Sequence, residues 1–502
     1  MHPPRPPRRP RLLTAFLLAP LLTGCFAATG DAGAAAGGKD AARLRVALAF
    51  PPAENLSPYG ADATILSRLG VTEGLTALDA NGAAVPALAS SWRREDDRTW
   101  RFTLREAVFQ DGTEVTPAAV VTALTRAGRA APAPAALSGV TLTARAQGAT
   151  GVRITTTDPD PVLPLRLTSP SLAVLAPKAY GGKGAVDPVG TATGPFTLTA
   201  VTGTTSAALD RFDDYWGGRA QASGIDARFI ADGTARANAL RTGQIDLAEA
   251  IPVSQAAALD AGSRRETATT RTTSLLLNTE SGTFKDAALR AAARAAVDTG
   301  ALAEGVYEGH ADPGAGIYGP AVTWAGGKRL TPTGRAKAKK PDGAPVTLAT
   351  YDNRPELPEA AQVLKQQLEK AGFTVQLEVR EYSRLESDAL AGKFDAFVGA
   401  RNSLLDTGDP VSLLASDFTC DGGYNLALLC DKDVDRAVER ARTVADTSER
   451  QDAALAAEAV ILATDAVVPL VHQRVVTGVA DTVGGVLLDP YERTLVGTGT
   501  RR

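Results

Sequence analysis

At 502 residues the chain is too long for one ordinary hydrophobic core, and its length predicts two or three compact units. Hydrophobic residues make up 44% of the chain and charged residues 22%, both normal for a globular protein. The formal net charge is −3, and no stripe of Lys and Arg is interleaved with aromatic residues, so the composition argues against nucleic-acid binding.

The N-terminus has the pattern of a bacterial secretion signal. Arginines without an acidic residue precede an apolar run at residues 12–22, which is too short to span a membrane but suits a signal peptide. The sequence Leu-Thr-Gly-Cys then resembles a lipobox, in which the cysteine, here Cys25, is lipidated. We therefore expect removal of residues 1–24 and a flexible, Gly/Ala-rich tether at residues 25–42. The alternative is an ordinary secretory signal with a chance cysteine.

The first predicted elements of the folded part are short strands and one helix. Residues 43–50 have the composition of a strand, and a loop rich in Pro, Asn and Gly follows at residues 51–60. Residues 99–104 alternate polar and apolar side chains, which predicts another strand. Residues 116–126 have helical spacing, with Pro117 placed in the first turn.

Residues 225–251 form the first predicted strand–helix–strand unit. A strand at 225–230 precedes a helix that ends near Gly243, and a second strand follows at 245–250. Glycine near a helix end followed by a strand is the expected punctuation.

The second half repeats this pattern over a longer stretch. In chain order it predicts a strand at 346–351, a helix at 358–370, a strand at 373–379, a helix at 382–390 and a strand at 394–398, then helices at 434–444 and 450–464 and a strand at 467–471. The alternating order predicts a parallel, doubly wound sheet covered by helices. Two α/β patterns in one secreted chain predict two lobes, with a small molecule held between them beyond the strand ends.

The cysteines predict one disulfide. If Cys25 carries lipid, Cys420 and Cys430 remain as an even pair in an oxidising compartment. Closing such a short loop would contribute about 3 kcal/mol in the chain-entropy treatment. The alternative is two free buried thiols, and the spacing does not match a metal-binding CxxC pattern.

A series of motifs links the chain to a known family. The matching positions near the N-terminus include Leu88, Ser91, Trp92, Phe102, Leu104, Arg105, Val108, Phe109, Asp111, Gly112 and Val120, and further matches follow at 193–196, 214–218, 278–290 and 409–425. This pattern resembles the family 5 extracellular solute-binding proteins, which serve oligopeptide, dipeptide and nickel importers. The resemblance covers about residues 44–478.

The resemblance implies an α/β, bilobal periplasmic-binding-protein-like fold (type II, large peptide-binding cluster). Lobe I would span 43–274 with an inserted subdomain at about 60–185, lobe II would span 275–470, and 471–502 would return to lobe I. The implied function is capture of a small peptide in the interlobe cleft and delivery to the permease and ATPase subunits of an ABC importer. The protein would be lipid-anchored at the outer face of the cell membrane, in the periplasm of a Gram-negative cell.

Candidate ligand-binding residues come from two segments. In peptide-binding relatives an aspartate before an Asp-Pro pair binds the peptide's α-ammonium group, and Asp406 is the nearest match, although the usual Trp is absent. Arg401 follows a predicted strand end, where a guanidinium suits a carboxylate, and Asn402 would support it. The alternatives are a loop-capping Asp and a solvated loop Arg. The family position of residues 50–59 implies a second cleft wall, with Phe50, Asn55 and Tyr59 as candidates.

Other functions remain open at this stage. Nickel or a metal–chelator complex is the alternative ligand, but His310 and His472 are the only histidines after the signal, too few for a bare-metal cage. We therefore predict no metal site and no cofactor. An enzyme is not expected, because the chain lacks GxSxG, HExxH and Walker A motifs. An extracellular hydrolase or a signalling lipoprotein is the alternative from a different class.

Overall fold

The computed structural model describes residues 42–181, 185–352 and 354–502. The predicted signal peptide, Cys25 and almost all of the predicted tether lie outside these residues. Among the helices of the described part, none combines the length and the apolar character that crossing a membrane requires.

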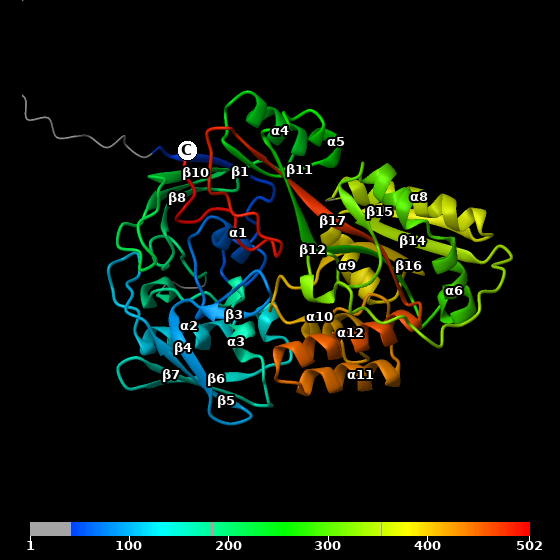
Figure 1. The fold of residues 1–502 in the computed structure, drawn as a ribbon, viewed down its shortest axis with the longest axis horizontal. Helices are drawn as coiled ribbons and strands as arrows, with labels where there is room; N and C mark the ends of the chain where they lie inside the picture. Colours follow the sequence, from blue (N-terminus) through cyan, green and yellow to red (C-terminus); the bar gives the residue numbers. More distant parts are fainter. Residues whose placement is uncertain (1–41, 182–184, 353) are drawn as a thin grey trace, which may run out of the picture. The chain divides into compact units, whose positions relative to one another are not determined.

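A mixed sheet of eleven strands runs through the described part of the chain (Figure 1). Its strand order is β15-β14-β16-β12-β17-β11-β1-β10-β9-β8, and β13 pairs with β17. The strands are β1 (Leu44–Leu48), β8 (Phe196–Thr202), β9 (Ser206–Arg211), β10 (Gly224–Phe229), β11 (Leu247–Ile251), β12 (Arg264–Leu277), β13 (Ala311–Pro313), β14 (Pro345–Tyr351), β15 (Thr374–Arg380), β16 (Ala396–Asn402) and β17 (Val467–Val479).

Two long strands join the halves of this sheet. β12 and β17 are antiparallel partners from Arg264 opposite Gly478 to Leu276 opposite Val467, and they run side by side between β11 and β16 (Figure 1). The register shifts between Ala268 and Thr272. The predicted lobe boundaries therefore fall on shared strands and not on loops.

The predicted doubly wound sheet of the second half is confirmed. β14 pairs in parallel with both β15 and β16, and α8 (Glu356–Lys370) and α9 (Tyr382–Leu390) make the connections. α8 buries Leu357, Leu364 and Leu368, which recur at helical spacing along one face. The first-half unit is also confirmed: β10 and β11 flank β1 in parallel, with α4 (Gly233–Arg241) between them in sequence.

The predicted end of the third strand of this unit is wrong. We expected the strand to stop at Val398, with Arg401 and Asn402 in the following loop, but β16 continues to Asn402. The reason is its antiparallel partner β12, which pairs Thr272 with Arg401 and Arg271 with Asn402. Because neighbouring strand residues point to opposite faces, the Arg401 and Asn402 side chains leave the sheet on different sides.

The inserted subdomain of the first lobe has its own antiparallel sheet. β4 (Ala89–Arg94), β5 (Thr99–Leu104), β7 (Gly151–Thr156) and β6 (Leu142–Gln147) pair in that order, and α2 (Pro117–Ala127) contacts β6. The hydroxyl of Thr116 caps α2 by accepting from the backbone N–H of Ala119. Phe102 and Val120 are fully buried in this core, as the predicted strand and helix require.

Three helices form a third hydrophobic cluster next to the second half of the sheet. They are α10 (Pro410–Phe418), α11 (Lys432–Thr443) and α12 (Thr447–Ala463). A buried ion pair joins α12 to the start of α10, since Arg450 donates to both carboxylate oxygens of Asp409 at 2.7 and 2.8 Å. The predicted disulfide between Cys420 and Cys430 is present and closes the loop between α10 and α11.

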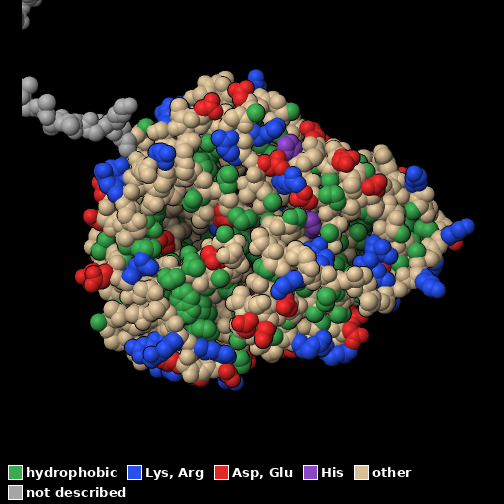
Figure 2. Space-filling view, in the orientation of Figure 1, with side chains coloured by type: hydrophobic (Ala, Val, Ile, Leu, Met, Phe, Trp, Pro, Cys, Tyr) green, Lys and Arg blue, Asp and Glu red, His purple; other side chains and the backbone are tan. Residues whose placement is uncertain are grey.

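The remaining elements connect these parts. They are α1 (Ala63–Arg68), β2 (Thr76–Leu78), β3 (Ala84–Pro86), α3 (Leu163–Arg166), α5 (Val253–Ala256), α6 (Ala287–Ala296) and α7 (Thr299–Ala301). On the face drawn in Figure 2, basic and acidic side chains are interspersed, and no continuous basic surface is visible there.

Candidate functional site

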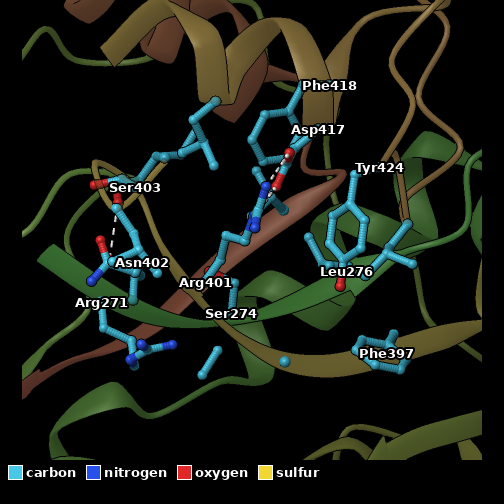
Figure 3. Close-up of a pocket in the computed structure, with 18 of the residues that line it drawn as sticks. Arg271, Ser274, Leu276, Phe397, Arg401, Asn402, Ser403, Asp417, Phe418 and Tyr424 are labelled. Atoms are coloured by element: carbon cyan, nitrogen blue, oxygen red, sulfur yellow. Dashed lines mark hydrogen bonds and ion pairs between the residues drawn. The ribbon is translucent and has the colours of Figure 1, made fainter. Parts of the chain in front are cut away.

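A cavity of about 170 Å³ lies in the second half of the molecule (Figure 3). β12 and β16 supply one side of the cavity, with Ser274 and Phe397 among the lining residues. α10 contributes Phe418, and the disulfide-closed loop contributes Tyr424. The cavity therefore sits where two strands of the sheet meet the neighbouring helical cluster.

Arg401 lines this cavity, but carboxylates already occupy its guanidinium (Figure 3). Its Nε donates to Asp417 at 3.0 Å and its Nη2 to the other oxygen of Asp417 at 3.5 Å, while Asp406 lies 3.8 Å away. Burial alone would lower the pKa of Arg401, but the charges of Asp417 and Asp406 outweigh it and raise the pKa. The side chain is thus a fixed cation whose Nε and Nη2 are bound by Asp417, with Asp406 beside Nη1.

Asn402 points away from this arrangement. Its carbonyl oxygen accepts from Thr270 Oγ1 at 2.6 Å and its amide donates to Glu492 Oε1 at 3.1 Å. The residue is buried and also lines the cavity, but these hydrogen bonds tie it to the C-terminal segment. Its position suits fixing the strand end better than contacting a solute.

Glu492 is the centre of a buried charge cluster. Arg271 of β12 binds both of its carboxylate oxygens at 3.0 and 3.1 Å, and Arg68 of α1 lies 3.6 Å away. Arg68 also pairs with Glu249 of β11 at 2.6 Å. Burial would raise the pKa of Glu492, but Arg271 and Arg68 overcome that effect and hold the pKa at about 2. The cluster links the first-lobe helix, both lobes' strands and the C-terminal return.

Arg354 is the functional candidate that the sequence analysis missed. It follows β14, and its guanidinium carbon lies 5.8 Å from the centroid of the Phe50 ring in the other lobe. Within the described residues its side chain makes no ion pair and no hydrogen bond. Burial, and next the charge of Arg271, lower the pKa of Arg354. The signal that could have found it is a basic residue just after the carboxyl end of a parallel strand.

The three candidate residues of the predicted wall at residues 50–59 lie in different surroundings. Phe50 is 42% exposed and faces Arg354, whereas Asn55 is exposed with a φ of 54°. Tyr59 packs against the first-lobe core, and burial raises the pKa of its hydroxyl to about 12. The buried carboxylate of Asp62 shapes the loop by accepting from three of its backbone N–H groups. Phe50 alone of the three candidates lies beside another candidate residue.

Asp406 lies near the cavity without lining it. Its side chain is 40% exposed, and its one ion pair is the 3.8 Å contact with Arg401. The structure therefore brings the side chains of Arg401 and Asp406 together, whereas the Asn402 side chain is turned toward Glu492. Phe50 lies near Arg354, and Asn55 and Tyr59 lie apart from both groups.

The two histidines are engaged elsewhere. His472 is buried, its Nδ1 lies 2.9 Å from Thr272 Oγ1, and burial lowers its pKa to about 4. His310 Nδ1 contacts Glu266 at 2.7 Å. In the part of the chain that the structure describes, no group of three or more His, Cys, Asp or Glu residues could hold a metal ion.

Comparisons with known proteins agree with this architecture. Residues 83–425 match the family model of the bacterial extracellular solute-binding proteins, family 5 Middle. The glutathione-binding protein GsiB of Escherichia coli (strain K12) is 27% identical over 463 residues, which cover 87% of this chain and 90% of GsiB.

Two solved structures show the same fold. NikA from Brucella suis in complex with Fe(III)-EDTA superposes with a TM-score of 0.78 at 22% identity, covering 91% of this chain and 99% of NikA. DppA from Helicobacter pylori in complex with the peptide STSA gives a TM-score of 0.76 at 20% identity, covering 91% and 97%.

Proposed function

Because the chain belongs to the bacterial extracellular solute-binding proteins of family 5, which serve ABC importers and are not enzymes, we propose that it captures a compact, carboxylate-bearing solute between its lobes. A short peptide is the leading candidate. Delivery to a permease and its ATPase subunits would follow, since a ligand favours the closed form by its higher affinity for that form.

The observation that carries this proposal is that the Arg354 guanidinium has no ion-pair or hydrogen-bond partner among the described residues, although the charges of Glu492 and Glu356 reach it. A half-buried guanidinium without a partner is costly, and a ligand carboxylate would relieve that cost. Two parallel N–H groups of a guanidinium match the two oxygens of a carboxylate. Phe50, next to Arg354, would complete the contact from the other lobe.

A relative of known ligand supports a compact solute. GsiB is a glutathione-binding protein, and glutathione is a short peptide with carboxylates. The cavity of about 170 Å³ is lined by neither Arg354 nor Phe50 and lies below the roughly 300–1,000 Å³ typical of sites for drug-sized ligands, so it would take one part of the solute. The relative favours a di- or tripeptide over a long oligopeptide.

Native mass spectrometry of the protein with its carried-over solute, followed by calorimetry with that solute, tests the proposal. We expect a peptide or a similar carboxylate, and Arg354→Ala should weaken its binding at least tenfold. Arg436→Ala, which alters an exposed arginine of α11 paired with Asp433, is the matched control and should bind normally. A bound metal–chelate complex would replace the peptide as the solute, and unchanged affinity in Arg354→Ala would remove the proposed carboxylate contact.

We also propose that Cys25 anchors the protein to the outer face of the cell membrane. The lipobox-like sequence supports this placement, and the Gly/Ala-rich segment after it would supply the tether. The mass of the mature protein should equal residues 25–502 plus lipid. Cys25→Ser should release the protein from the membrane fraction, and retention of the variant there would contradict the anchor.

A further inference from the structure

The walls of the lobe II cavity are mostly apolar and aromatic. Its apolar lining includes Leu276, Phe397, Leu413, Phe418, Leu426 and Val467. The volume of about 170 Å³ is close to the roughly 150 Å³ of an engineered apolar cavity that binds benzene. One six-membered ring with its substituents therefore fits, whereas a long flexible chain does not.

The polar side chains at the cavity are already engaged with one another. Arg401 is held by Asp417, and the hydroxyls of Tyr382 and Tyr424 bond to each other. Arg271, at the other end of the cavity, binds both oxygens of Glu492. A charged group that entered the apolar part would lose its hydration, and the charge of the nearest cation, Arg401, is already met by Asp417 and Asp406.

Ser274 is the exception among these groups. It lies on β12 beneath Arg401, it is half-buried, and its hydroxyl makes no hydrogen bond within the described residues (Figure 3). The hydroxyl can donate or accept, so it suits a single polar substituent on an otherwise apolar group.

The arrangement around Arg401 favours a flat group. Asp417 and Asp406 face its N–H edges, and its guanidinium carbon lies 4.7 Å from the centroid of the Tyr424 ring. Guanidinium planes stack on aromatic rings, and aromatic pairs prefer ring centroids 4.5–7 Å apart. Arg401 and Tyr424 thus already stack on each other, and a planar ring in the cavity would meet the rings of Phe397 and Phe418, which also line it.

We infer that this cavity is a subsite for one aromatic ring of the solute, and that the hydroxyl of Ser274 binds a phenol hydroxyl or an indole N–H on that ring. The inference rests on the proposed function, which places the solute's carboxylate at Arg354. It narrows the substrate class to compact carboxylates that carry an aromatic side chain.

A panel of dipeptides tests the subsite by calorimetry. The probes are Ala-Ala, Ala-Leu, Ala-Phe and Ala-Tyr, with the same pairs in reverse order. At least one Phe or Tyr peptide should bind tenfold or more tightly than Ala-Ala, and more tightly than its Leu counterpart. Binding of the whole panel without an aromatic preference would overturn the subsite and leave peptide capture intact. If no peptide binds to the folded protein, both the subsite and the peptide proposal fail.

Variants at Ser274 separate the ring from its polar contact. Ser274→Leu fills the cavity and should reduce the aromatic-to-alanine affinity ratio at least tenfold. Ser274→Ala should keep the preference for Phe but lower the Tyr-to-Phe ratio severalfold. Ser91→Leu, which adds the same bulk at an exposed position of β4, is the matched control. Circular dichroism melting checks that each variant folds, and should Ser274→Leu fail to fold, an unchanged Tyr-to-Phe ratio in Ser274→Ala would overturn the contact.

Discussion

An arginine lies at the carboxyl end of β16 and another lies just after β14, but only the first is paired with a carboxylate. Arg401, at the end of β16, is bound by Asp417 of α10 and lies near Asp406. Arg354, just after β14, has no carboxylate partner in the described part of the chain and faces an aromatic ring of the other lobe. The position of a strand end thus indicates a candidate residue, but the availability of its charge depends on partners far away in sequence.

We expect this difference to distinguish charged residues that stabilise the fold from charged residues that bind the solute. The paired charges, including Arg271 with Glu492, contribute to a rigid frame whose removal should mainly change stability. The unpaired charge should mainly change affinity. The following experiments test that division, beginning with the largest expected effect.

Glu492→Gln should be the most destabilising single change. It removes the one carboxylate that binds Arg271 and lies near Arg68, and breaking a buried ion pair costs about 3–5 kcal/mol. Urea unfolding followed by circular dichroism measures the difference in free energy. Asp433→Asn breaks an exposed pair with Arg436 and serves as the control, with no measurable change expected. Equal stability of the two variants would mean that the cluster does not hold the frame together.

The same carboxylate predicts an acid-side loss of stability. The folded-state pKa of about 2 lies below the ordinary value of 4.5, so this stabilisation is complete above pH 4.5 and disappears as the pH falls toward 2. The difference corresponds to about 3 kcal/mol. Unfolding curves of the wild type between pH 5 and 2 should show this loss of stability in addition to the losses that other carboxylates cause. Glu492→Gln should lose less stability over the same pH range, because the contribution of Glu492 is already absent. Parallel curves for the two proteins would contradict the low pKa.

Loss of the disulfide should destabilise the part of the protein around Arg401, at the end of β16. Cys420 and Cys430 are ten positions apart, and opening this loop costs about 2.7 kcal/mol in the chain-entropy treatment. The loop carries Tyr424, which lies over Arg401, so reduction should also loosen the cavity wall. Thermal melting with and without reductant measures the first effect. A Cys420→Ser/Cys430→Ser variant that melts like the wild type would refute it.

Exchanging either arginine for alanine compares the two strand ends directly. Arg354→Ala should weaken solute binding at least tenfold, about 1.4 kcal/mol, with little loss of stability. Arg401→Ala should lower stability because it leaves Asp417 buried without its partner. If this variant also binds the solute tenfold more weakly, the loss of affinity should appear together with the loss of stability. Calorimetry and urea unfolding on both variants separate these effects. If Arg354→Ala mainly lowered stability and Arg401→Ala mainly lowered affinity, the roles of the two residues would be exchanged.

Asp406→Asn should have the smallest effect on stability. The side chain is 40% exposed and lies 3.8 Å from Arg401, so the pair contributes below about 0.5 kcal/mol. Its effect on affinity is more informative, because an aspartate that binds the solute's ammonium group would lose tenfold or more. Comparing a peptide with its N-acetylated form in both proteins measures this contact, and equal discrimination would remove Asp406 from the site.

The fold could be predicted from the sequence to a greater extent than the directions of the candidate site's side chains. Alternation along residues 373–379 and the apolar positions of α8 were enough for the parallel sheet, because burial on one face dictates local periodicity. Arg401 was identified from its place after a strand, although β16 is longer than predicted. Its partner Asp417 was not foreseen, since it comes from a helix whose position depends on tertiary packing.

The loop at residues 50–59 shows the same limit. Family position indicated the segment, but the direction of each side chain depends on how Asp62 folds the loop. Phe50 faces Arg354, whereas Tyr59 packs into the first-lobe core. The contact between Phe50 and Arg354 joins residues far apart in the sequence, and no local pattern encodes it.

The long paired strands β12 and β17 also have a mechanical consequence. A connection made of paired strands resists shear and stretching, because every sliding step would break several backbone hydrogen bonds at once. Bending or twisting breaks fewer of these bonds, and the pairing is irregular between Ala268 and Thr272 and again between Thr273 and Ser274, where strands bend and twist most readily. A motion of one lobe against the other would therefore pass through these two irregular stretches of β12 and β17, and would leave the regularly paired stretches intact.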